Sequence, residues 1–296
     1  MARRVIAICG DTHCGSTVGL CPPEGMELDD GGLYEASEAQ HWLWAQWVDG
    51  WKQAKRIIGK SPFDLVLNGD LIDGDHHRTS QIASVLTGIH LRCAVDSLRE
   101  PLALKPSAVH VMRGTPSHVG RSAEVEEGIA RVLKAEGWPV KMDPDTGKAS
   151  SYRRRLDVDG VRLDIAHHGR MGQRAHTKGS YSKLYAFDLF AEQMLEMYTA
   201  MKSDPANVAD IFDAMRPADI ALRSHNHKFM DSGPDHRGVT RLISLPAFQF
   251  ATEFVYRIAA ESLADIGIVV IVIEDGRYQV HPILFPAARS KTMGAK

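Results

Sequence analysis

Cysteine is scarce in this 296-residue chain, and none of its four cysteines forms a C-x-x-C pair. A disulfide-stapled scaffold needs a shorter and cysteine-richer chain, so that class of small secreted protein is excluded. We therefore expect free thiols and a reducing compartment. The cysteines are Cys9, Cys14, Cys21 and Cys93.

Long apolar runs and an excess of one charge are also lacking. No apolar run approaches the roughly 20 residues of a membrane span, and the run after Arg4 is too short for a signal peptide. A net charge of -2 and a pI near 6.7 give no sign of a nucleic-acid coat protein or a membrane-surface binder. We expect a cytoplasmic protein with no membrane partner, while a local basic patch stays open.

The first half of the chain alternates between short β-branched runs and apolar residues at helical spacing. The second half carries hairpin signals, of which Asp159-Gly160 is typical of a type I′ turn. Among the expected elements are strands at 5–9, 64–67, 108–112, 161–166 and 220–222, and helices at 36–58, 79–98, 123–136, 182–201 and 205–215. This pattern predicts one α/β domain over residues 1–285, with two stacked sheets and outer helices, followed by a flexible tail over 286–296.

Aspartate and histidine follow the ends of five expected strands. These segments are Asp11-Thr12-His13, Asp70-Leu71-Ile72-Asp73, Thr115-Pro116-Ser117-His118, His167-His168 and His225-Asn226-His227. Sites in α/β proteins lie at the carboxyl ends of strands. Carboxylate oxygen together with imidazole nitrogen suits Mn, Fe, Ni, Co or Zn, whereas Mg and Ca prefer oxygen alone. One carboxylate can bridge two cations about 3.5–4 Å apart, so the pattern favours a two-metal site.

The five segments, in this order, resemble the motifs of the calcineurin-like metallophosphoesterase family. The matching motifs are Asp11-Thr12-His13, Gly69-Asp70-Leu71-Ile72-Asp73, Gly114-Thr115-Pro116-Ser117-His118, His168-Gly169 and Ser224-His225-Asn226-His227, which span residues 11–227. The resemblance implies a four-layer αββα sandwich of two stacked mixed sheets flanked by helices. It also implies two divalent metal ions and a phosphate-ester substrate.

The resemblance further implies a set of ligands. One metal would take Asp11, His13, Asp70 and His227, and the second would share Asp70 and take His168 and His225. Asp73 would orient a ligand rather than bind metal, although turn chemistry alone could also place an aspartate there. His168 is preferred to His167 because the family's ligand directly precedes glycine.

The third motif departs from the family. Thr115 stands where an asparagine usually supplies an amide oxygen to the second metal. His118 lies three residues further on, whereas the family's histidine follows its asparagine directly. His118 is expected to be the general acid or a phosphate contact, or else to replace the missing asparagine as a ligand. This threonine pattern is similar to a phage-type variant of the family.

The expected activity is hydrolysis of phosphate esters by a metal-bridging hydroxide, with Asp70 and His118 as catalytic residues. The sequence favours a phosphodiester, nucleotide or nucleic-acid substrate, because basic residues follow two of the motifs. These residues are Arg78, Arg170, Arg174 and His176. Two alternatives remain: a phosphomonoesterase, and a catalytically silent scaffold whose second metal is weakly held by Thr115. The oligomeric state is open, with a homo-oligomer among the alternatives.

Overall fold

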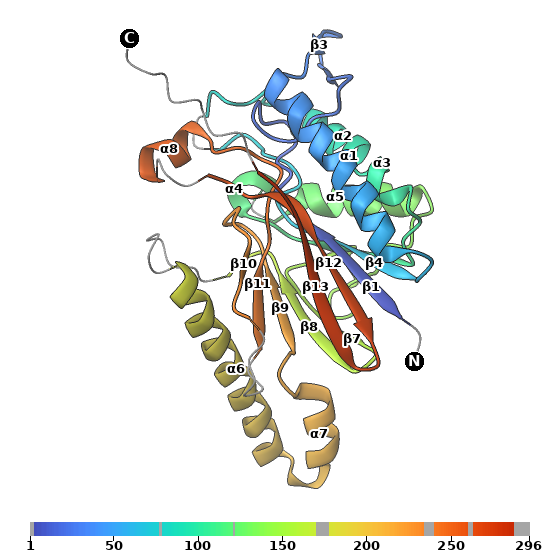
Figure 1. Ribbon diagram of the computed structural model, residues 1–296, viewed down its shortest axis with the longest axis vertical. Helices are drawn as coiled ribbons and strands as arrows, with labels where there is room; N and C mark the ends of the chain where they lie inside the picture. The colour runs from blue at the N-terminus through green and yellow to red at the C-terminus, as the bar shows by residue number, and fades with distance from the viewer. Residues whose placement is uncertain are drawn as a thin grey trace.

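Two β-sheets pack face to face in the computed structural model, and helices cover their outer sides (Figure 1). The structure describes residues 3–76, 79–120, 122–169, 178–233, 240–259 and 263–286. The expected tail therefore lies outside the described residues, apart from Pro286.

The first sheet has six strands. They are β1 (Arg4–Cys9), β4 (Phe63–Asn68), β5 (Ala108–Met112), β6 (Ser150–Ser151), β12 (Ile266–Glu274) and β13 (Arg277–Phe285), in the spatial order β13-β12-β1-β4-β5-β6. Strands β1, β4, β5 and β6 run parallel, while β12 is antiparallel to both of its neighbours. Because strand side chains alternate, Ile6 and Ile8 face the second sheet, whereas Val5 and Ala7 pack under helices.

The second sheet has five strands. They are β7 (Arg153–Val158), β8 (Val161–Ala166), β9 (Ile220–Arg223), β10 (Met230–Asp231) and β11 (Arg241–Ser244), in the order β10-β11-β9-β8-β7. The β7–β8 turn consists of Asp159 and Gly160, whose φ angles of 50° and 81° are the positive pair that a type I′ turn requires. The expected hairpin is confirmed.

Helices complete four layers. A core of α1 (Glu38–Ile58), α2 (Thr87–Ser97) and α5 (Glu124–Ala135) packs on the outer face of the first sheet. On the outer face of the second sheet, α6 (Lys178–Ser203) contributes Ala186 and Leu189 to a smaller cluster with Ala221 and Leu242. Aliphatic side chains fill the space between the sheets. The expected αββα sandwich is confirmed.

Helix α1 shows why the sequence folds in this way locally. The Ser37 hydroxyl accepts a hydrogen bond from the Gln40 backbone N–H, and Gln40 Oε1 accepts one from the Ser37 backbone N–H, which makes a capping box. Apolar residues then recur every three or four positions, so one face is buried on the first sheet. That face includes Leu43, Trp47, Trp51, Ala54 and Ile58.

The expected helix over 79–98 begins only at Thr87, and the prediction is wrong for residues 79–86. Hydroxyl groups explain the difference. Thr79 Oγ1 accepts from the backbone of Gln81, and Ser84 Oγ accepts from the backbone of Leu86. These local bonds compete with the helical pattern, so the segment forms turns.

The remaining elements are short. They are β2 (Met26–Glu27), β3 (Leu33–Tyr34), α3 (Arg99–Leu102), α4 (Pro116–Val119), the 3-10 turn Pro205–Asn207, α7 (Val208–Met215) and α8 (Glu253–Ala259). The helical piece expected over 205–215 is thus divided into a 3-10 turn and α7. All four cysteines are buried free thiols, as expected. No helix in the described part of the chain is both long and apolar enough to span a bilayer.

Candidate metal centre

The five motifs follow the carboxyl ends of β1, β4, β5, β8 and β9. Strands β1, β4 and β5 are parallel neighbours in the first sheet, and β8 and β9 are parallel neighbours in the second. Parallel strands present their carboxyl ends at one edge, so residues from about two hundred positions apart meet there. Backbone hydrogen bonds join these loops, among them those from the N–H of Asp11 to the carbonyl of Gly69 and from the N–H of Ser224 to the carbonyl of His167.

The loop backbones are strained at the residues that matter. Five of the nine described non-glycine residues with a positive φ belong to the motifs, with φ between 44° and 72°. They are Asp11, His13, Asp70, His225 and His227. A side chain in the left-handed region costs free energy, and such residues cluster at functional sites.

One donor group consists of Asp11, His13 and His227. Asp11 Oδ1 is buried and lacks a hydrogen-bond partner, although it lies 3.3 Å from His227 Nε2 and 3.8 Å from His13 Nε2. The two Nε2 atoms are themselves 3.1 Å apart. An unpartnered buried oxygen facing two ring nitrogens is the arrangement that a cation satisfies.

Asp73 orients this group from behind. His13 Nδ1 donates to Asp73 Oδ1 over 3.0 Å, which leaves His13 Nε2 directed at Asp11. Gln249 donates to the same carboxylate oxygen over 3.1 Å. Metal-binding histidines commonly donate their second ring N–H to such a carboxylate.

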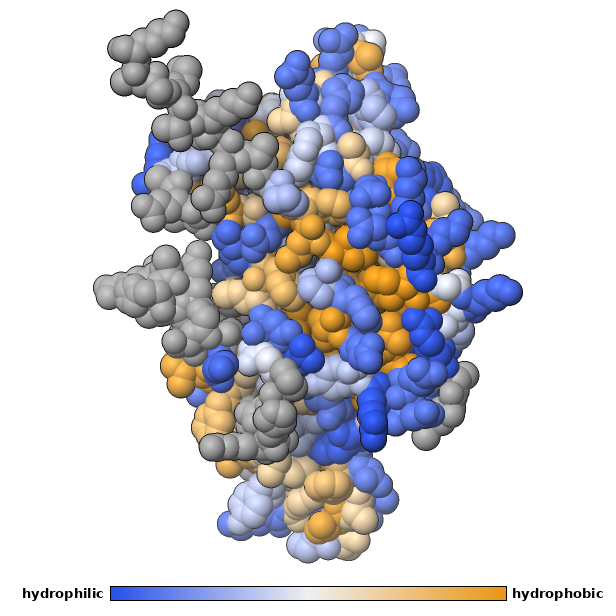
Figure 2. Space-filling view, viewed as in Figure 1, coloured by the Kyte–Doolittle hydropathy of each residue, from blue (hydrophilic) through white to orange (hydrophobic). Residues whose placement is uncertain are grey.

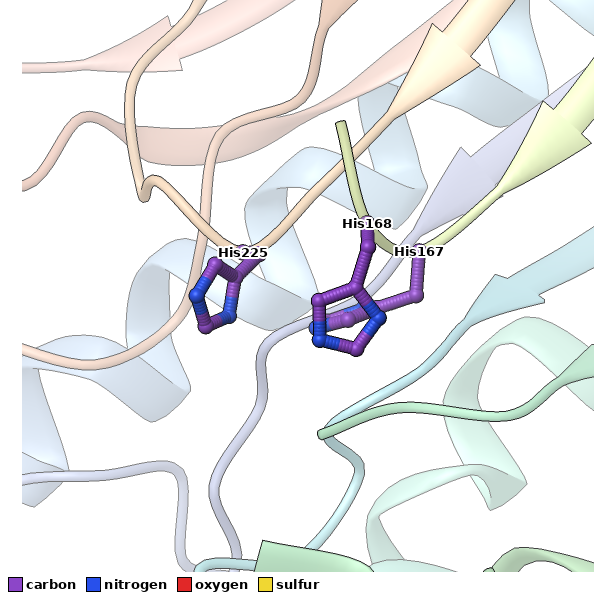
Figure 3. A group of neighbouring side chains, drawn as sticks. All are labelled: His167, His168 and His225. Carbon is purple, nitrogen blue, oxygen red and sulfur yellow. The ribbon is translucent and has the colours of Figure 1, made fainter. Parts of the chain in front are cut away.

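The second donor group consists of His167, His168 and His225. Figure 3 shows the three rings gathered from two loops, with the paired histidines on one side and His225 on the other. The hydroxyl of Thr115 lies 3.3, 3.2 and 3.0 Å from a ring nitrogen of His167, His168 and His225 respectively. Thr115 therefore places a hydroxyl oxygen beside all three rings.

Asp70 lies between the two groups. His167 Nε2 is 2.9 Å from Asp70 Oδ2. Thr115 donates to Asp70 twice, from its backbone N–H over 2.6 Å and from its hydroxyl over 2.8 Å. Asp70 also shares one compact group with Asp11 and another with His13. A carboxylate in this position can contact two cations at once.

His168 was preferred to His167 as a metal ligand, but His167 is at least as well positioned to bind a metal. It is fully buried, and its Nδ1 donates to the carbonyl of Asn68 over 2.7 Å, which directs Nε2 to Asp70. His168 is more exposed and reaches the same group from outside. The structure thus brings both histidines to the second group, where the sequence favoured one.

His118 lies beside the first group. Its Nδ1 donates to the carbonyl of Asp73 over 2.7 Å, and its ring packs edge-on against His13 with centroids 4.7 Å apart. Burial, followed by the neighbouring His13 charge, lowers the pKa of His118 to about 4. The imidazole is therefore neutral at pH 7, and Nε2 carries the lone pair.

Sequence reasoning missed Glu126 of α5. Its side chain is fully buried beneath the centre and accepts a hydrogen bond from the backbone of Gly114. Burial, followed by the nearby charge of Asp70, raises the pKa of the Glu126 carboxyl to about 8. In the sequence, Glu126 is one of three glutamates in the first turn of α5, where acidic residues are common. Only the packing distinguishes it.

Two glycines allow the loops to approach closely. A Cβ at Gly114 would lie 2.2 Å from Asp70 Oδ1, and one at Gly69 would lie 2.5 Å from His167 Nδ1. Both motif positions therefore require glycine for space, and Gly69 also has a φ of 82°.

The charges of the centre are mutually dependent. Burial would lower the pKa of His13 and of His167, but neighbouring carboxylates outweigh it and raise each pKa to about 10. Conversely, burial would raise the pKa of Asp11 and Asp70, but the histidines hold each pKa below its ordinary value. Two carboxylates are thus balanced by imidazolium protons, which divalent cations can replace.

Four basic residues were expected to contact the substrate. Arg78, Arg170, Arg174 and His176 lie outside the described residues. A cavity of about 980 Å³ is lined by Arg4, Asp64 and Arg154, among others, but it lies near the amino ends of β1 and β4, away from the motifs. The centre is therefore defined by its donor groups rather than by this cavity.

No family model and no curated protein matches the chain. Among solved structures it is similar to wild-type Vps29 complexed with zinc from Entamoeba histolytica, at 10% identity and a TM-score of 0.36, over 95% of this chain and 99% of that one. The sulfate thiohydrolase SoxB of Thermus thermophilus matches at 10% identity and 0.41, over 96% and 57%. A phosphatase from Mycoplasma pneumoniae matches at 8% identity and 0.36, over 96% and 93%. At these values the likeness is coarse.

Proposed function

We propose that this chain is a calcineurin-like metallophosphoesterase that hydrolyses phosphate esters with two divalent cations and prefers phosphodiesters, such as nucleotides or nucleic acid. The observation that carries the proposal is the convergence of two donor groups on the shared carboxylate of Asp70. Imidazole nitrogen with few carboxylates suits Mn, Fe, Ni, Co or Zn.

Bound cations would polarise a phosphate oxygen and make a water molecule more acidic. The chain's own residues hold the centre in shape for this chemistry. Asp73 and the Asn68 carbonyl fix the ring orientations of His13 and His167. Asp11 and Asp70 bring only two negative charges, so a centre with two divalent cations keeps a net positive charge and attracts phosphate.

His118 is proposed to pass a proton to the leaving group through Nε2, and because the ring is neutral at pH 7, Nε2 must first take up that proton. Its Nδ1 proton is held by the Asp73 carbonyl, so proton exchange would occur at Nε2. The alternative role as a ligand is supported by its grouping with His13 and Asp70. The pH–rate profile and the metal content of His118→Asn together separate the two roles. Loss of an acid removes a limb of the profile, whereas loss of a ligand lowers the metal content.

The activity test uses manganese-loaded protein against bis-p-nitrophenyl phosphate, p-nitrophenyl phosphate, cyclic nucleotides, and single- and double-stranded DNA. We expect hydrolysis that stops on chelation and is abolished in Asp70→Asn, while Asp145→Asn, at an exposed carboxylate, leaves it unchanged. Full activity of the metal-free protein would refute the proposal.

The preference for diesters rests on the basic residues after His168, so the relative rates on the two nitrophenyl substrates decide it. Faster turnover of p-nitrophenyl phosphate would indicate the phosphomonoesterase instead. A chain that binds two metals yet cleaves none of these esters would support the silent scaffold.

A further inference from the structure

Helix α6 has two apolar faces, although only one of them packs on a sheet. Ala186, Leu189, Gln193 and Met197 are buried against the body of the protein. A helix advances about 100° per residue, so the residues between these positions lie on the other side. There the large apolar side chains are exposed: Leu184, Phe187, Met194, Leu195 and Tyr198.

Helix α7 packs against α6 and is also exposed. None of its residues is buried, and Val208 and Phe212 are exposed. In Figure 1, α6 and α7 project together at the lower end of the molecule, and Figure 2 shows apolar side chains over that end. We call the seven exposed residues the α6–α7 patch.

The α6–α7 patch is large enough to hold a stable dimer together. Its side chains are exposed by 38% to 64%. If the roughly 200 Å² of a large aromatic side chain is taken as an upper value for all seven residues, the exposed apolar area is at most on the order of 700 Å². A standard protein interface buries about 800 Å² on each partner, and isolated monomers rarely leave so large an apolar area open.

Charge and spacing indicate the kind of partner. Between residues 183 and 215 there are six acidic and two basic side chains, which disfavours both nucleic acid and an anionic lipid surface. Within α6 the exposed apolar residues recur three or four positions apart around Ala191, which is the spacing of a helix-packing seam. Such a seam can pair with a copy of itself about a two-fold axis.

We propose that the α6–α7 patch is the interface of a homodimer of this chain, formed by α6 and α7 of one copy packing against the same helices of the other. The proposal is independent of the proposed enzymatic function. It assigns a partner to a surface that the described part of the chain leaves uncovered.

The test is the mass of the full chain in solution, measured by sedimentation velocity at about 100 µM, well above the micromolar or tighter Kd expected for this interface size. We expect twice the 32.7 kDa chain mass. Leu195→Glu should weaken the dimer at least about 30-fold without changing the circular dichroism spectrum or the metal content. Leu33→Glu is the matched control, because Leu33 is 60% exposed and Leu195 is 64% exposed.

Three results would overturn the proposal. The first is a wild-type chain that is monomeric at this concentration. The second is a Leu195→Glu variant that dimerises as tightly as the wild type. The third is an equal loss of the dimer in Leu33→Glu, which would show that the effect is not specific to the α6–α7 patch.

Discussion

The Nε2 atoms of His13 and His227 lie 3.1 Å apart, although 214 residues separate them in the chain. Two ring nitrogens at this distance can share one proton, but two protons would repel each other. The buried oxygen of Asp11 faces the same point without a hydrogen-bond partner. A proton shared between these ring nitrogens would therefore lie where one of the proposed cations would bind.

Metal binding is expected to release protons. The pKa of His13 and of His167 is raised to about 10, so both rings are protonated at neutral pH and must lose a proton to bind a cation. Metal affinity should consequently rise with pH up to about 10, by about tenfold per pH unit for each proton displaced. Calorimetric titrations in buffers of different ionisation enthalpy would count the protons. An affinity that stays constant from pH 6 to 8 would contradict this interpretation.

The hydroxyl of Thr115 is expected to support the second cation through Asp70. Thr115→Val keeps the side-chain shape but removes the donor to Asp70 Oδ2, so the affinity for the second metal should fall about 10- to 100-fold. Thr115→Asn, which supplies an amide oxygen, should bind the second metal at least as tightly as the native chain. Thr87→Val, at an exposed threonine, is the control.

Equilibrium dialysis with manganese measures the affinity of each variant. Equal affinities for the native chain and Thr115→Val would show that the hydroxyl has no part in the site.

Gly114→Ala should disable the centre by crowding. The added methyl group would meet Asp70 Oδ1 at 2.2 Å, so the carboxylate must move and metal binding should be lost. Gly88→Ala is the matched control, since no atom lies within 4 Å of the new methyl group. That change within α2 should raise the free energy of unfolding by roughly 0.5–1 kcal/mol. Metal content and thermal unfolding of the two variants can be compared directly, and a Gly114→Ala chain with its full metal content would exclude the crowding argument.

Glu126 should make the metal-free protein less stable as the pH rises from 4.5 to about 8. Its folded pKa of about 8 exceeds the ordinary value of 4.5, so its contribution to stability is fully present below pH 4.5 and is lost as the pH rises through 8. Glu126→Gln keeps an acceptor for the Gly114 backbone but cannot ionise, so its Tm should fall less between pH 6 and 9 than that of the native chain.

Glu126→Ala leaves the Gly114 donor unpaired and should cost about 1–3 kcal/mol of unfolding free energy. Glu124→Gln, at an exposed glutamate of the same helix, should follow the native pH profile. Parallel profiles for the native chain and Glu126→Gln would refute this role.

The sequence predicted the layers and the main elements because their signals are local. Ser37 marks the start of α1, and Asp159-Gly160 marks the β7–β8 turn. The motif residues were also visible, because aspartate and histidine directly after an apolar strand are unusual, and the structure brings them to one edge.

Other features depend on packing that no local pattern encodes. The burial of Glu126 is decided by the strand ends beneath which α5 lies, and the second apolar face of α6 is evident only once its first face is assigned to a sheet. The preference for His168 over His167 did not take such packing into account. It followed a motif rule, whereas the strand end places both rings in the same group.

The account rests on two cations sharing Asp70, and anomalous diffraction from a manganese-loaded crystal tests this most directly. It predicts two peaks about 3.5–4 Å apart, one among Asp11, His13 and His227, the other among His167, His168 and His225, with the Asp70 carboxylate between them. A map from fully loaded protein with no peak near Asp70 would contradict it.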